Sequence, residues 1–169
     1  MAARFDYQSI FQEESWTKVF DNAEGKDDEF YQLVIGEFER SNYPNLEISR
    51  VEVDSNTSFF GKKDKREMVM VQAKESKFAK YHVFFSANIM GNVCQFARYE
   101  CMQRGFFNKI ASFSGEQLRA QLRLQCNNLT DWETFTMLDN LSDIIYSVVM
   151  RKMDVDFEQN KRLLSFKNK

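Results

Sequence analysis

Three consecutive runs of sequence decide the fold: REMVMVQAK (residues 66–74), KYHVFFSANI (80–89) and VCQFARYECM (93–102). They are rich in β-branched and aromatic residues, which favour strands. Gly91 and Asn92 separate the last two runs. This pair suits a two-residue hairpin loop, because glycine readily adopts the positive φ that a type II′ turn requires at its first central position. The stretch therefore predicts an antiparallel sheet at the centre of the chain.

Two registers are possible for this hairpin, and they differ in the length of the loop. A two-residue loop sets Ile89 opposite Cys94, and His82 opposite Cys101. A three-residue loop with a bulge gathers a cleaner apolar face and leaves Arg98 and Glu100 on the other face, where we expect them to form a solvated ion pair. We favour this second solution, although a slip of one residue changes every cross-strand pair. The apolar face that it gathers consists of Val83, Phe85, Ala87, Ala97, Tyr99 and Cys101.

Segments on both sides of these runs complete an α+β fold. LEISRVEVDS at residues 46–55 predicts a further strand, which we expect to be the first strand in chain order. Apolar residues at helical spacing, with capping signals, predict helices over residues 9–20, 27–40, 114–126 and 130–153. We therefore expect a mainly antiparallel sheet of four or five strands, flanked by N-terminal helices and by two C-terminal helices that pack across one face.

Length and composition indicate one domain with an ample core. The chain has 169 residues, of which 43% are hydrophobic and 15% aromatic. We expect a single domain over residues 1–153, followed by a flexible polar tail at 154–169 that is basic at its end. The net charge of −2 provides no whole-protein field that would attract nucleic acid or an anionic membrane.

The cysteines and the apolar runs predict a cytoplasmic protein. Cys94, Cys101 and Cys126 are odd in number and lack CxxC spacing, which favours reduced thiols over a disulfide framework. No apolar run approaches the roughly 18 residues of a membrane span, and the first residues lack the apolar region of a signal peptide.

The sequence contains no motif for catalysis, a cofactor or a metal. His82 is the only histidine, so a pair of histidine ligands cannot form within one chain. No glycine-rich phosphate loop is present. A thiol enzyme based on Cys101 and His82 is retained only as a hypothesis to be tested, because a thiol beside an imidazole can become reactive. We therefore predict no enzymatic activity, no cofactor and no metal.

Surplus apolar residues favour a role in protein–protein interaction. Met137 and Ile144 lie off the main apolar stripe of the helix predicted at 130–153, and Phe59 and Phe60 lie in a loop. Surfaces of this kind mark binding sites for partners or for further copies of the same chain. The sequence therefore predicts an adaptor, a chaperone-like factor or a subunit of a larger assembly, acting as a homo-oligomer or with a protein partner.

A single-stranded nucleic-acid-binding module is the alternative. Lys62, Lys63, Lys65 and Arg66 directly follow Phe59 and Phe60. Single-strand binders combine cations for the phosphates with aromatic rings on which bases stack. Lysine is also common at sheet edges for solubility, so this loop is a less specific signal than a clear basic footprint.

Overall fold

The computed structural model describes residues 10–55, 64–74, 81–102, 120, 126 and 128–155. The described part contains five strands and two long helices. In chain order these elements are β1 (Ile10–Val19), α1 (Lys26–Ser41), β2 (Leu46–Ser55), β3 (Asp64–Ala73), β4 (Tyr81–Met90), β5 (Val93–Met102) and α3 (Leu129–Lys152).

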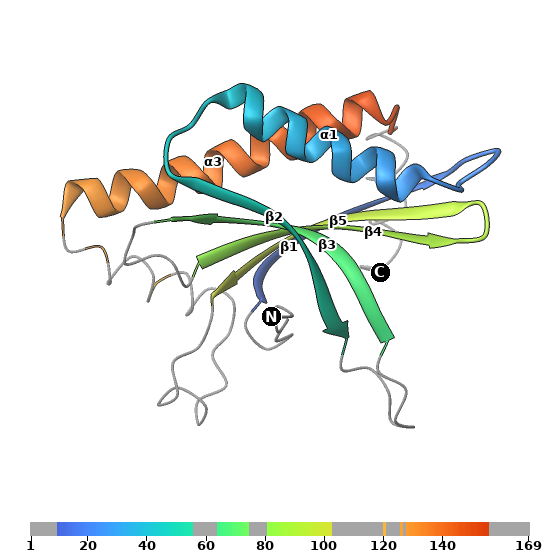
Figure 1. Cartoon of the computed structure of the whole chain (residues 1–169), viewed down its shortest axis with the longest axis horizontal. Helices are drawn as coiled ribbons and strands as arrows, with labels where there is room; N and C mark the ends of the chain where they lie inside the picture. Colours follow the sequence, from blue (N-terminus) through green and yellow to red (C-terminus); the bar gives the residue numbers. More distant parts are fainter. Residues whose placement is uncertain are drawn as a thin grey trace, which may run out of the picture.

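The strands form one antiparallel sheet in the order β1-β5-β4-β3-β2. The two strands that come first in the chain therefore form the two edges of the sheet. α1 crosses the sheet between these edges, and α3 lies beside it on the same face (Figure 1). The predicted α+β class with a mainly antiparallel sheet is confirmed.

The helix predicted for residues 9–20 is wrong, because β1 occupies this segment. β1 pairs with β5 from Ile10 to Val19, and the exposure of its side chains alternates. Glu14, Trp16 and Lys18 are partly buried, whereas Glu13 and Thr17 are exposed. Pairing with a distant strand has overridden the local helical pattern, as tertiary contacts commonly do. Of the predicted N-terminal helices, only α1 is present.

The helices predicted at residues 27–40 and 130–153 are confirmed as α1 and α3. α3 begins after Asn128, whose side chain accepts a hydrogen bond of 2.8 Å from the backbone N–H of Asp131. The second C-terminal helix, predicted at 114–126, falls largely outside the described residues. Most of the predicted tail, residues 156–169, lies outside them too, whereas Val155 is buried in the core.

The hairpin uses the two-residue loop, so the preferred three-residue register is wrong. Ile89 lies opposite Cys94, and His82 lies opposite Cys101. Gly91 has φ 63° while Asn92 keeps a negative φ, which is the pattern of a type II′ turn. This register places Arg98 and Glu100 on the face that the helices cover. They are only 2% and 0% exposed, so the expectation of a solvated ion pair is wrong as well.

The main core lies between the sheet and the two helices. It includes Phe30, Val34 and Phe38 from α1, which pack on strand residues such as Phe85 and Phe96. α3 contributes residues from its own apolar face: Phe135, Leu138, Ile145, Tyr146, Val149 and Met150. A second, smaller cluster on the opposite face of the sheet contains Val53, Met68, Phe84 and Cys101.

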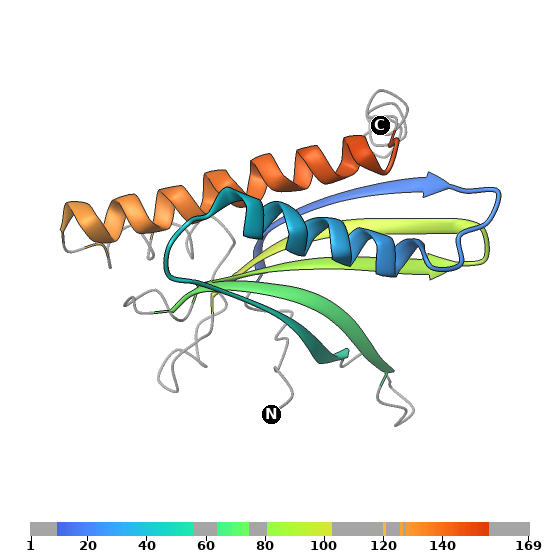
Figure 2. The same cartoon turned by 45° about the horizontal axis from the view of Figure 1, so that its top comes forward.

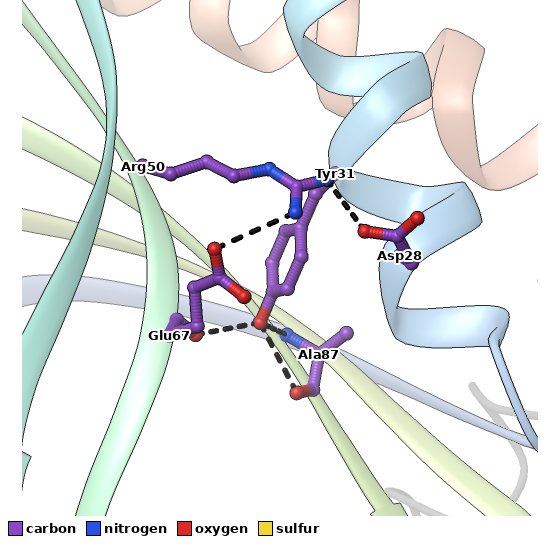
Figure 3. A network of polar contacts seen from close by, with 5 residues as sticks. All are labelled: Asp28, Tyr31, Arg50, Glu67 and Ala87. Carbon is purple, nitrogen blue, oxygen red and sulfur yellow. Dashed lines mark hydrogen bonds and ion pairs between the residues drawn. The ribbon is translucent and has the colours of Figure 1, made fainter.

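β3 and β4 are joined along only part of their length. Their ladder covers residues 69–72 of β3 and 82–85 of β4 in the described part of both strands. Beyond it, β2 and β3 bend away from β4, β5 and β1 (Figure 2). Continuing the register would put Glu67 opposite Ala87, and the hydroxyl of Tyr31 lies between these two residues instead (Figure 3).

The hydroxyl of Tyr31 takes the place of the direct backbone hydrogen bonds between Glu67 and Ala87. Its hydroxyl donates to the carbonyl oxygen of Glu67 at 2.7 Å and accepts from the backbone N–H of Ala87 at 3.0 Å. The guanidinium of Arg50 lies over its ring, 5.4 Å from the centroid. Arg50 also forms ion pairs with Asp28 at 2.8 Å and with Glu67 at 3.4 Å. One side chain of α1 therefore satisfies backbone groups of two diverging strands.

We expect Tyr31→Phe to lower the free energy of unfolding by about 1–3 kcal/mol, because it removes the hydrogen-bond partner of the partly buried Ala87 N–H. Urea unfolding followed by circular dichroism measures this loss. Tyr43→Phe is the matched control, since no hydroxyl contact of Tyr43 is found among the described residues. Equal stability of the Tyr31→Phe variant and the wild type would contradict this role.

We also expect stability to fall between about pH 10 and pH 12. Burial raises the pKa of Tyr31 to about 12 from an ordinary value of 10.0. The unfolded chain therefore loses this proton at a lower pH than the folded protein does. The stabilisation is complete below pH 10 and is lost as pH rises toward 12. Urea midpoints at pH 9, 10 and 11 measure the fall, which should be smaller in Tyr31→Phe.

Candidate interaction surface

α3 has a buried face and an exposed apolar face. Met137 and Ile144 are 49% and 60% exposed, as expected from their position off the main stripe. They are seven residues apart and therefore lie above one another after about two turns. Leu141 and Val148 are half-buried and fall on the same side of the helix. We call these four residues, Met137, Leu141, Ile144 and Val148, the outer stripe.

A shallow depression adjoins the outer stripe at the N-terminal half of α3. Its volume is about 390 Å³, and Tyr43, which follows α1, forms one wall. The remaining lining comes from α3 itself: Thr130, Glu133, Thr134, Thr136, Met137 and Asn140. The depression therefore joins an apolar side chain to hydroxyl, amide and carboxylate groups, a mixture typical of the edge of a protein interface.

Charge is distributed unevenly along this side of α3. Glu133 is exposed near the beginning of the helix, whereas Arg151 and Lys152 are exposed at its end. Lys152 forms an ion pair of 2.5 Å with Glu37 of α1, and this contact lowers the pKa of the Glu37 carboxyl. The exposed side of α3 therefore runs from an acidic end to a basic end.

Polar contacts fix α3 to the sheet. The hydroxyl of Tyr146, which is buried, donates to the carbonyl oxygen of Phe96 at 3.0 Å. At the end of the helix, the ammonium of Lys18 donates to the carbonyl oxygen of Met153 at 3.3 Å and pairs with the carboxylate of Asp154 at 3.1 Å. These contacts hold the helix in one orientation and so determine which side chains point outward.

A charge cluster with a buried centre, formed by Arg98 and Glu100, lies beside α3. Arg98 pairs with Glu100 on the same strand at 3.0 Å, with Asp143 of α3 at 3.4 Å and with Glu14 of β1 at 3.6 Å. Burial raises the pKa of Glu14, and Arg98 opposes this effect. Because one guanidinium links two strands and a helix, the cluster has a clear structural role in fixing α3. The described residues contain no group of three or more His, Cys, Asp or Glu side chains placed to hold a metal ion.

The predicted nucleic-acid residues are only partly described. Phe59, Phe60, Lys62 and Lys63 lie outside the described residues. Lys65 and Arg66 are exposed on β3, and Lys65 forms an ion pair with Glu52. The nearby cation Arg50 is also paired with carboxylates, those of Asp28 and Glu67. This part of the sheet therefore carries acids beside its bases, and the nucleic-acid alternative stays a prediction.

His82 and Cys101 are cross-strand neighbours, as the two-residue register required. Cys101 is buried in the smaller apolar cluster, next to Phe84. Cys94 is buried in the main core, and burial raises its pKa to about 11, so its thiol stays protonated at neutral pH. Both cysteines are packed as small hydrophobic residues, and the thiol-enzyme hypothesis gains no support from their surroundings.

Comparisons with known proteins give no family. No protein-family model matches the chain, and no curated protein matches it. The solved structure of TTHA0849 from Thermus thermophilus aligns with 81% of this chain and 99% of its own, with 11% identity and a TM-score of 0.24. The di-domain ARO/CYC BexL from the BE-7585A biosynthetic pathway aligns with 83% of this chain and 50% of its own, with 7% identity and a TM-score of 0.20. Both scores are too low to bear on fold or function.

In the part of the chain that the structure describes, no helix combines the length and the apolar character needed to cross a bilayer.

We expect Arg98→Met to lower the free energy of unfolding by about 3–5 kcal/mol, because it leaves the carboxylate of Glu100 buried without its cation. Replacing both residues, with Arg98→Met and Glu100→Leu, should recover most of this loss, since an apolar pair needs no compensating charge. Urea unfolding measures both variants. Arg40→Met is the control: Arg40 forms an exposed ion pair with Glu37, and its loss should change stability by less than about 1 kcal/mol. Additive losses in the double variant would show that Arg98 and Glu100 do not act as a pair.

Proposed function

We propose that this protein is a non-enzymatic interaction protein that binds another polypeptide through the outer stripe of α3. This proposal rests on one observation: Met137 and Ile144 are exposed on the same side of α3, a helix that polar contacts fix to the sheet. Burying a large aliphatic side chain contributes about 1.5–3 kcal/mol. Two such residues left in solvent are a substantial source of binding energy for a partner that covers them.

The shape of the surface favours a helical partner. The outer stripe extends over three turns with apolar residues at spacings of four, three and four, which is the pattern that a second helix packs against. The depression beside Tyr43 provides polar groups at one end of the stripe. Helices that bind other helices commonly use apolar residues at positions i, i+4 and i+7, and the outer stripe has apolar residues at this spacing.

The rigid attachment of α3 also supports binding. The contacts of Tyr146, Lys18 and Arg98 fix the helix before any partner arrives. A preorganised surface loses less conformational entropy on association than a flexible one. The outer stripe is therefore presented in one geometry.

We expect Ile144→Asp and Met137→Asp to remove a bound polypeptide, because each places a charge within the apolar surface that the partner would cover. Native mass spectrometry of the full chain purified from its own source measures this. The wild type should have a mass above that of the 20.1 kDa chain, and the variants should not. Met90→Asp is the control, since Met90 is equally exposed but lies at the hairpin end of β4. A wild-type protein that carries no other polypeptide would contradict the proposal, and so would variants that keep it.

A further inference from the structure

We infer that the occupant of the outer stripe is α3 of a second copy of this chain, packed antiparallel about a two-fold axis. This inference rests on the proposed function, because it names the partner of the same surface. The spacing of the apolar residues and the distribution of charge along α3 carry it. Symmetric dimers are the commonest assemblies of soluble proteins, and their interfaces are self-complementary.

The outer stripe is self-complementary in an antiparallel arrangement. Its four residues occupy alternating a and d positions of a heptad pattern. An axis perpendicular to α3, midway between Leu141 and Ile144, places each of these residues opposite the other in the second copy. The same axis places Met137 opposite Val148. Every apolar residue of the stripe then meets an apolar residue, at both ends of the pair.

The charges agree with the same axis. It brings Glu133 level with Lys152 of the second copy and about 1.5 Å, one residue, from the level of Arg151. Because of the two-fold symmetry, this acid–base contact forms at each end of the interface. In a parallel pair, Glu133 would lie beside its own copy, and Arg151 beside its own copy. Like charges at such a distance are destabilising, so the antiparallel arrangement is favoured.

The helix ends support this direction as well. Antiparallel helices place the positive N-terminal end of one macrodipole beside the negative C-terminal end of the other. Thr130 and Thr134, near the beginning of α3, are small enough to admit the long side chain of Arg151 from the second copy. An acidic and threonine-rich end therefore meets a basic end, and the apolar residues lie between them.

Charge reversal in the full-length protein tests the inference. Sedimentation velocity over a concentration series at low ionic strength should show a wild-type dimer. Glu133→Lys and Arg151→Glu should each weaken it by roughly 2- to 30-fold, since each removes two symmetric ion pairs at the exposed rim of the interface. Combining both substitutions should restore the wild-type dissociation constant to within about twofold, because the exchanged charges would again attract each other between the two copies.

Three results would overturn the inference. A wild-type protein that stays monomeric at every concentration excludes the second copy. A dimer that Glu133→Gln strengthens indicates a parallel pair, because this change removes the repulsion between the two copies of Glu133. A dimer that neither reversal changes uses another surface. The proposed function is judged separately by native mass spectrometry. It stands if Ile144→Asp removes a bound polypeptide of any mass, including one that differs from this chain, and it fails if the wild type carries none. A far-ultraviolet circular dichroism spectrum matching the wild type confirms that each variant is folded.

Discussion

The hydroxyl group of Tyr31 is the contact on which the shape of this protein depends. A sheet that divides between β3 and β4 leaves backbone donors and acceptors in the interior, where each needs a partner. Tyr31 provides one partner to each strand, and Arg50 lies over its ring while pairing with Asp28 and Glu67. The divergence of β3 from β4 therefore depends on the position of α1, because α1 carries Tyr31. Tyr146 acts similarly for α3 on the same face of the sheet, where its hydroxyl bonds the carbonyl of Phe96 in β5.

The two faces of α3 have different physical characters. The inner face combines an apolar core with the Arg98 cluster, so sliding or rotating the helix would break the ion pair between Asp143 and the buried guanidinium of Arg98. The outer face carries Met137 and Ile144, which are exposed and which the chain's own core does not use, beside the half-buried Leu141, which packs against the edge of that core. A rigid inner attachment gives the outer side chains a constant spacing, which is what recognition by a second helix requires.

The sequence predicted the elements whose pattern is local. β2 to β5, α1 and α3 were identified because alternation, helical spacing and the Gly91 turn are short-range signals. β1 was missed because its strand state depends on pairing with β5, far away in the chain. The register was missed because a one-residue shift produces another acceptable apolar face. For the same reason, the burial of Arg98 and Glu100 could not be seen. The exposure of Met137 and Ile144 followed from the helix period alone.

The sheet order also imposes an order on biosynthesis. β1 is made before the other strands of the sheet, yet Val19 pairs with Val93 and Ile10 with Cys101. It therefore emerges from the ribosome long before β5, which is its neighbour in the described part of the sheet. Pairs so distant in sequence form slowly, because a long loop must close first. Until β5 has been translated, the backbone of β1 lacks the strand with which it pairs among the described residues, and it is open to pairing with other nascent chains. The strand that forms one edge of the native sheet is thus also a segment of the growing chain that is open to intermolecular pairing and aggregation.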